Sequence, residues 1–311
     1  MDYKKYLAEY WKTIEENNEK DYKFGVDVTG YRKEAHIPYE GDYDPDHTLN
    51  LYYPDSYRPC DAKLPVIIDI HGGGWMYGNV DVSERYLGFL ASKGYAVMAM
   101  NYRLLQRTDL AGQIADIFAA MHWLSQYGPD RGFDLSRVLL TGDSAGGHLS
   151  ILTECIELSR ELQEIYGVKP FDFSINAISV SSPVVEMDKL YIVASEETEL
   201  GRETAKAYVE LMLGDKGKSA SWNHHMSISE VVPGLSLPPV QIIDSEMDSL
   251  RAHTGYLIDI LKKNNQRYET LTCSKENGIH LMHVFNIGHW EWKESIEANE
   301  KMLEFFDRVC R

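Results

Sequence analysis

The feature that most constrains this chain is a Gly-x-Ser-x-Gly sequence set between two different local patterns. Residues 138–141 are mostly apolar and strand-like, Gly142, Ser144 and Gly146 follow, and the next segment has helical periodicity. A serine hydroxyl attacks poorly unless it is held clear of the backbone beside a base, and a sharp strand-to-helix turn with glycines at its crowded positions holds it in that way. The pattern alone leaves two interpretations open, a nucleophile at Ser144 and a plain turn, and the remaining sequence has to decide between them.

A second glycine-rich segment follows an earlier strand. Residues 65–70 are a short apolar run that suits a strand buried on both faces, and they lead into His-Gly-Gly-Gly-Trp at residues 71–75. Three consecutive glycines cost backbone entropy, so they indicate either tight packing against a neighbour or bare N–H groups that approach a ligand atom. A phosphate-binding loop is disfavoured, because no Gly-Lys-Ser/Thr follows and the dinucleotide glycine spacing is absent.

Strand-like and helix-like segments alternate through the first half of the chain. Apolar strands are expected at 65–70, 95–100 and 138–141, with helices at 86–91 and 114–124. Such alternation predicts parallel strand-helix-strand units with right-handed crossovers. Ligands of these folds bind beyond the carboxyl ends of the strands, where both glycine-rich segments fall. The sequence therefore predicts an α/β fold, with a mostly parallel central sheet and helices on both faces.

The domain organisation is indicated by the segments in which strands and helices no longer alternate. Residues 186–235 are helical and polar, and residues 2–20 have the pattern of an amphipathic helix. Residues 30–45 are polar and broken by Gly and Pro, and no internal repeat or low-complexity linker is visible. We expect one domain over residues 1–311, with cap elements at approximately 1–45 and 186–235 that are placed to cover a site.

A serine nucleophile needs an imidazole to take its proton and a carboxylate to orient that imidazole. In this kind of fold the three follow the chain order serine, acid, histidine at successive strand ends. Asp248 follows the strand expected at 240–243, and His283 follows the next strand, expected at 268–273. Spacing alone leaves the acid and the base open. The competing residues are Asp244, Glu246, His280 and His289.

Attack on an acyl carbonyl would create an oxyanion, which needs preorganised N–H donors. One candidate donor is the N–H of Ala145, at the start of the helix that follows the serine. The N–H groups of Gly73 and Gly74 are the others, and this use gives the triple glycine a chemical reason.

The charge balance and the cysteines limit the partners and the location. The chain has 31 basic and 48 acidic residues, a net charge of −17, which disfavours nucleic acid and anionic lipid as partners. No window approaches the roughly 18 apolar residues of a membrane span, and the first residues lack the apolar run of a signal peptide. We expect a cytoplasmic protein that needs no metal or cofactor. Its cysteines have no metal-ligand spacing: Cys60, Cys155, Cys273 and Cys310.

With these motifs, the sequence resembles the hormone-sensitive-lipase-like branch of the α/β-hydrolases, which includes bacterial carboxylesterases and acetyl esterases. The resemblance covers residues 65 to about 290. It rests on the segments 71–75, 101–103, 142–147, 246–250 and 283–285. It implies the α/β-hydrolase fold with a helical cap, and it places the functional residues. The nucleophile falls on Ser144, the acid on Asp248, the base on His283, and the oxyanion donors on Gly73, Gly74 and Ala145.

Two positions depart from the family's pattern. Ser249 follows the acid where the family usually has proline, and Val284 follows the histidine where the family usually has a small residue. Val284 is the departure expected to reshape the wall of the substrate pocket.

The resemblance implies a cofactor-free serine carboxylesterase that works through an acyl-enzyme. Trp75 beside the oxyanion loop indicates a restricted acyl pocket, and hence acetyl to butyryl esters as substrates. An arylformamidase or other amidase with the same triad is one alternative, and a non-catalytic binding protein on the same fold is another. The expected partner is a small-molecule ester. The sequence leaves the physiological alcohol and the oligomeric state open, with a homodimer as one alternative.

Overall fold

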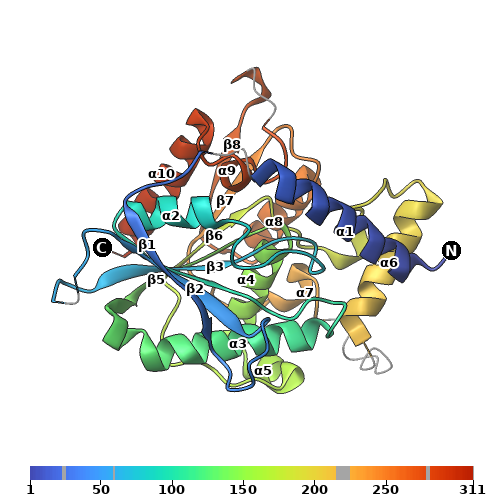
Figure 1. The fold of residues 1–311 in the computed structure, drawn as a ribbon. Helices are drawn as coiled ribbons and strands as arrows, with labels where there is room; N and C mark the ends of the chain where they lie inside the picture. Colours follow the sequence, from blue (N-terminus) through green and yellow to red (C-terminus); the bar gives the residue numbers. More distant parts are fainter. Residues whose placement is uncertain (23–25, 59, 215–224, 278–280, 311) are drawn as a thin grey trace.

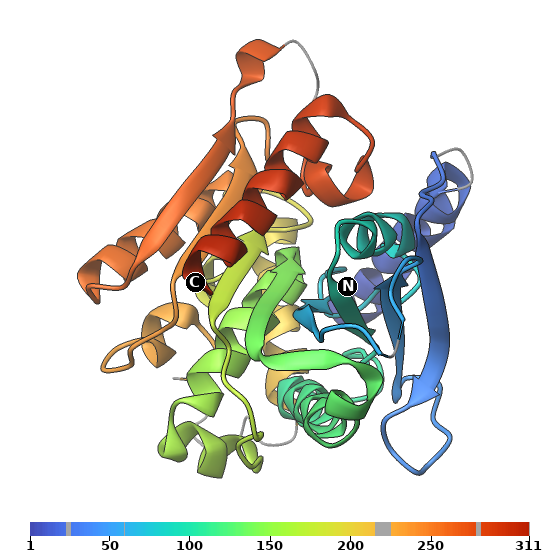
Figure 2. The same ribbon diagram turned by 90° about the vertical axis from the view of Figure 1, so that its left-hand side faces the viewer.

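The computed structural model describes residues 1–22, 26–58, 60–214, 225–277 and 281–310. Its centre is an eight-stranded sheet in the order β1-β2-β4-β3-β5-β6-β7-β8. Strand β2 pairs antiparallel with both β1 and β4. The remaining neighbours, in the order β4-β3-β5-β6-β7-β8, pair parallel. Figure 2 shows the sheet from β1 (blue) across to β8 (orange). The strands are β1 Tyr31–Pro38, β2 Thr48–Pro54, β3 Leu64–Ile70, β4 Ala96–Met100, β5 Phe133–Asp143, β6 Ala177–Ser181, β7 Val240–Ser245 and β8 Tyr268–Cys273.

Helices cover both faces of the sheet, as the sequence predicted (Figure 1). Neighbouring residues of a strand point to opposite faces, so Val66 and Ile68 of β3 join the core beneath α3, α4 and α8, whereas Ile67 joins the core beneath α2 and α10. None of the described helices is long and apolar enough to cross a membrane. The α-helices are α1 Tyr3–Tyr22, α2 Glu84–Ser92, α3 Leu110–Tyr127, α4 Ser144–Glu157, α5 Arg160–Tyr166, α6 Glu199–Leu213, α7 Ile228–Val231, α8 Arg251–Lys263, α9 Phe285–Gly288 and α10 Lys293–Val309.

Strand β1 lies where the sequence suggested only a broken polar segment. Residues 31–38 pair antiparallel with β2 at the edge of the sheet, so the range 1–45 expected for the cap includes a strand of the central sheet. The strand is half-buried to exposed throughout, and its register with β2 shifts between Glu34 and Ile37. An edge strand of this kind lacks the apolar run that marks a buried strand, so periodicity does not reveal it.

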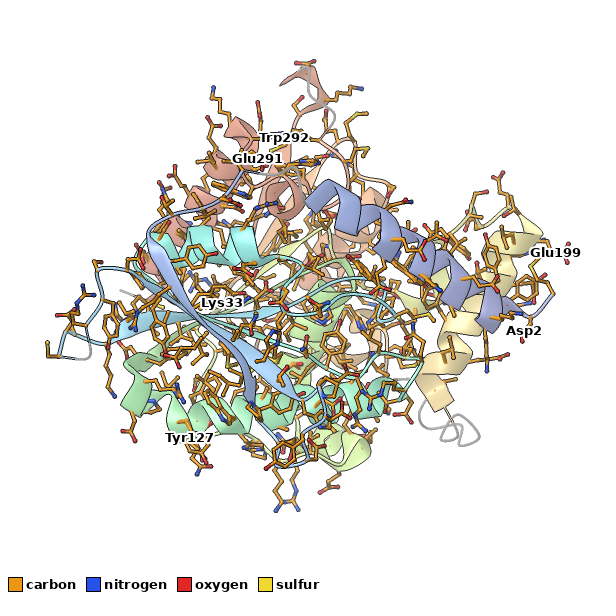
Figure 3. The ribbon with its side chains drawn as sticks, viewed as in Figure 1. Asp2, Lys33, Tyr127, Glu199, Glu291 and Trp292 are labelled. Atoms are coloured by element: carbon orange, nitrogen blue, oxygen red, sulfur yellow. The ribbon has the colours of Figure 1, made fainter. Side chains whose placement is uncertain are left out.

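Two helices far apart in the sequence pack against each other beyond the sheet. Helix α1 contacts α6, which belongs to the long connection between β6 and β7. Lys4 of α1 and Glu210 of α6 form an ion pair at 3.2 Å. Asp2 and Glu199, near the starts of the two helices, lie at the same outer edge of the molecule (Figure 3). The α1–α6 pair thus comes from the two segments in which the sequence predicted cap elements.

Candidate active site

The turn between β5 and α4 holds Ser144 in a strained backbone conformation. The strand ends at Asp143, the helix begins at Ser144, and the serine has a φ of 51°, in the left-handed region. A β-carbon at Gly146 would collide with the Ile70 carbonyl oxygen, so only glycine allows the elbow to lie this close to β3. Non-glycine residues in this region cost about 1–3 kcal/mol and cluster at functional sites.

The triple-glycine loop lies directly against this elbow. Gly72 N–H donates to Asp143 Oδ1 at 3.0 Å, and the Gly73 carbonyl accepts from Met76 N–H and Tyr77 N–H. Gly73 and Gly74 have φ values of 107° and 58°, which glycine adopts readily.

Three backbone donors at this junction have no acceptor. Within the part of the chain that the structure describes, no hydrogen bond engages the N–H groups of Gly73, Gly74 or Ala145. Gly74 and Ala145 are buried, and Gly73 is half-buried. Buried N–H groups without a partner are rare in folded proteins. N–H groups grouped in this way on two contacting loops can bind an anionic oxygen.

Asp248 and His283 form a hydrogen-bonded pair. The imidazole Nδ1 lies 3.1 Å from Asp248 Oδ1 and 3.2 Å from Oδ2. The Asp248 side chain is 1% exposed and the His283 side chain 28%. The carboxylate is therefore buried behind the imidazole, and Nε2 is the ring nitrogen that does not face it. Burial favours a raised pKa for Asp248, but the hydrogen bond and charge of His283, a hydrogen bond from Ser182 and the N–H of Leu250 together hold its pKa below the ordinary value.

The competing residues have other environments. Glu246 is exposed and accepts hydrogen bonds from Ser274 and Lys275, and Asp244 is a buried residue of β7. His289 stacks on Trp292 with ring centroids 4.0 Å apart, and its side chain is 52% exposed. His280 lies outside the described residues. Among the described candidates, only Asp248 and His283 are paired with each other.

The histidine lies close enough to the elbow for its charge to act there. Burial raises the pKa of Asp143, the residue before Ser144, to about 6, and the charge of His283 acts in the opposite direction. No hydrogen bond joins Ser144 to His283 in the described chain. Contacts of this kind are often long before substrate binds and shorten in the reacting complex.

Ser182 is a site residue that the sequence reasoning missed. It follows β6, is 2% exposed, has a φ of 50°, and its side chain helps to lower the pKa of the Asp248 carboxyl. The signal that could have found it is its place at the carboxyl end of a strand next to the strand that delivers the acid.

Replacing Ser182 with alanine is expected to lower kcat about 10-fold, because Ser182 helps to keep the Asp248 carboxyl charged and interactions with charged groups contribute more than neutral ones. KM should stay within about twofold of the original. Steady-state kinetics on a short-chain ester check this, with Ser181→Ala as the matched control. The Ser181 hydroxyl accepts from Asn286 Nδ2, and no described hydrogen bond joins it to the acid, so the control should keep kcat within about twofold. Equal losses in the two variants would contradict a role for Ser182 at the acid.

The two residues predicted to line the substrate pocket have different exposures. Trp75 is fully buried, its indole N–H donates to His148 Nδ1 at 3.3 Å, and its ring packs edge-on against Tyr208 of α6. Val284 is half-buried with a φ of 53°, a strained value for a β-branched residue next to the histidine. Trp75 is part of the packed core behind the triple-glycine loop, and Val284 is the neighbour of the candidate base His283.

Among the described residues, one group has side chains close enough together to hold a metal ion. Asp42, Asp44 and His47, on the connection between β1 and β2, have potential ligand atoms within 4.8 Å of one another. Asp42 Oδ2 already contacts His47 Nδ1 at 2.6 Å, and Asp44 pairs with Arg107. These contacts use the same atoms that a metal would need, so the group gives no reason to assign one.

Comparison with known proteins identifies the family to which this arrangement belongs. A protein-family model described as BD-FAE matches residues 49–254 of the 311. The chain belongs to the BD-FAE family. This match extends from β2 into α8 and so includes both glycine loops and the acid, and it confirms the α/β-hydrolase fold of the esterase branch that the motifs predicted.

Several relatives of this BD-FAE chain are named as esterases. A solved structure of esterase B from Lactobacillus rhamnosis is 42% identical with a TM-score of 0.92, over 99% of this chain and 96% of that one. Another structure of the same esterase, with a C4-C4 SN3 tributyrin phosphonate, is 42% identical with a TM-score of 0.90, over 97% and 93% of the two chains. Carboxylesterase NlhH of Mycobacterium tuberculosis is 28% identical over 66% of this chain and 62% of its own length, less than two thirds of that relative. The prediction of a carboxylic ester hydrolase is thus confirmed at the level of the family.

Proposed function

We propose that the protein is a serine carboxylesterase that hydrolyses short-chain esters through an acyl-enzyme. The observation that carries this proposal is the set of three unpartnered N–H groups, on Gly73, Gly74 and Ala145, beside the strained Ser144. The Asp248–His283 pair supports it, because a buried carboxylate fixes the imidazole with Nδ1 protonated and Nε2 free to accept a proton.

The proposed reaction has two halves that use the same groups. His283 Nε2 takes the proton of Ser144 as Oγ attacks the ester carbon, and the carbonyl oxygen becomes an oxyanion held by the three N–H groups. His283 then gives its proton to the alcohol oxygen as the carbon–oxygen bond breaks, which leaves an acyl-serine. Water attacks that acyl carbon with His283 again as base, and the acid leaves as Ser144 regains its proton.

A preference for acetyl to butyryl esters is part of the proposal. It is supported by the buried bulk of Trp75 and Met76 in the loop that carries two of the oxyanion donors, and by the tributyrin phosphonate described with the relative from Lactobacillus rhamnosis. We expect kcat/KM for a C4 aryl ester to exceed that for the C12 ester by about 100-fold, since a rigid pocket rejects extra methylenes at about 1–3 kcal/mol. Initial rates on C2, C4, C8 and C12 esters of one phenol measure this. A faster C12 ester would contradict it.

The same panel separates the proposal from its alternatives. An N-formyl aryl amide with higher kcat/KM than the C4 ester would identify an arylformamidase or other amidase. Absence of turnover on every ester and amide, together with failure of a fluorophosphonate to label the protein, would favour a non-catalytic binding protein.

We also propose one domain in which α1 and the segment 186–235 form a cap. The contact between α1 and α6 and the Lys4–Glu210 ion pair support this. The proposed location is the cytoplasm, which is supported by four cysteines that are all free.

A further inference from the structure

Helix α1 places an indole directly on the oxyanion loop. A β-carbon at Gly74 would collide with Cζ2 of Trp11 and lie 2.6 Å from Cε2 and 2.8 Å from Cη2. The flat ring therefore packs against the α-carbon of Gly74, in the space that any other residue would fill. This contact joins the first helix of the chain to the loop that is expected to carry two of the oxyanion donors.

Each of the three loop glycines has a different close neighbour. A β-carbon at Gly72 would meet the Asp143 carboxylate of the elbow, and one at Gly73 would meet the Tyr77 carbonyl within the same turn. Only the Gly74 neighbour comes from outside the catalytic fold, from α1. The loop is thus held between the nucleophile elbow at Gly72 and the cap at Gly74.

The position of the indole is fixed from several sides. Trp11 Nε1 donates to the hydroxyl of Tyr208 on α6, and the ring stacks on Tyr77 with centroids 6.3 Å apart and planes 13° apart. One helical turn earlier, Leu7 is fully buried in the main core. A ring that is hydrogen-bonded, stacked and anchored by its own helix can restrain the loop on which it rests.

We propose that Trp11 is a positioning residue for the oxyanion loop, a role that rests on the proposed function. Gly73 and Gly74 have positive φ values, and glycine can change from such a conformation to others at little cost. Their N–H groups stabilise the oxyanion only when they point at it. The indole on Gly74 removes this freedom before substrate arrives. The contact acts on transition-state stabilisation and not on binding of the ground state, so its loss lowers kcat and leaves KM nearly unchanged.

The test uses three variants and two measurements. Trp11→Ala is expected to lower kcat on a C4 ester about 10- to 100-fold with KM within about twofold, because loss of a whole oxyanion donor costs about 100- to 1000-fold. Trp11→Phe keeps a ring on Gly74 and should stay within about threefold of the original kcat. The matched control is Tyr3→Ala, which removes an aromatic side chain that packs against the same core from the same side of α1, about two helical turns before Trp11. It should also stay within about threefold.

The second measurement is the rate of covalent labelling by an aryl phosphonate, whose P=O oxygen uses the same donors. This rate should fall in Trp11→Ala in proportion to kcat. If Trp11→Ala does not fold, as judged by its thermal unfolding, Tyr208→Phe replaces it. That change removes the hydroxyl that accepts from the indole but keeps the ring beside Trp75, and kcat should fall about 3- to 10-fold.

Three outcomes would overturn the role of Trp11. They are an unchanged kcat, a loss that appears in KM alone, and an equal loss in Tyr3→Ala. The first would leave Trp11 as core packing, the second as a wall of the substrate pocket, and the third would mean that docking of α1 as a whole is what matters. Failure of the proposed function looks different, because the unaltered protein would then neither hydrolyse the ester nor react with the phosphonate.

Discussion

Replacing Ser144 with alanine is expected to reduce kcat on a C4 ester by about 10⁴- to 10⁶-fold, the range seen when a serine nucleophile is removed from a complete triad. The reason is that Ser144 lies at the strained start of α4, next to Ala145 and against the triple-glycine loop, and is the proposed attacking group. The hydroxyl of Ser144 makes no hydrogen bond within the described residues, so its removal should leave the unfolding midpoint within a few degrees of the original. Steady-state kinetics measure the expected loss of kcat, and a thermal melt measures the unfolding midpoint.

A matched control for this variant is Ser150→Ala, two helical turns further along α4. Its buried hydroxyl donates to the carbonyls of Gly146 and Thr141, so it tests the effect of losing a serine hydroxyl near the elbow without touching the reaction. The control should keep kcat within about threefold. Turnover by Ser144→Ala within 10-fold of the original enzyme would remove Ser144 as the nucleophile.

The second large effect is expected from Asp248→Asn, which should lower kcat about 10⁴-fold at neutral pH. An amide in place of the carboxylate can donate to Nδ1, and this would move the imidazole proton to Nε2, where the base must be free. The measurement is kcat over pH 6 to 9 on a C4 ester.

Glu246→Gln is the control for the acid, since Glu246 lies two residues earlier and has its own partners in Ser274 and Lys275. It should keep kcat within about twofold. A large loss in Glu246→Gln with a small loss in Asp248→Asn would reverse the assignment of the acid, which residue spacing alone left open.

Much of the sheet could be predicted because its central strands are apolar on both faces. Residues 65–70, 95–100, 138–141 and 240–243 are short apolar runs, and the structure places all of them in parallel strands. Edge strand β1 could not be found in this way, because one side of it faces water and its residues are largely polar.

In the candidate site, too, local features could be predicted from the sequence and long-range contacts could not. The elbow and the triple glycine are local patterns, since each glycine answers a steric demand that can be stated from the sequence. The effect of Ser182 on the pKa of Asp248 and the contact of Trp11 with Gly74 join segments far apart in the chain, and neither serine nor tryptophan signals its partner locally. These contacts form because distant elements pack together in the folded chain, and hydrophobic periodicity does not predict which residues will meet.

The most direct test is to find which atom of the protein attacks the phosphorus of an ester-like aryl phosphonate and displaces its aryloxide. The protein is treated with one equivalent of an aryl phosphonate carrying a butyl chain, then digested and mapped by mass spectrometry. We predict a single adduct, on the peptide that contains Ser144 and on that residue. An adduct on another serine, or no adduct in a preparation that hydrolyses the C4 ester, would contradict the claim that Ser144 is the nucleophile.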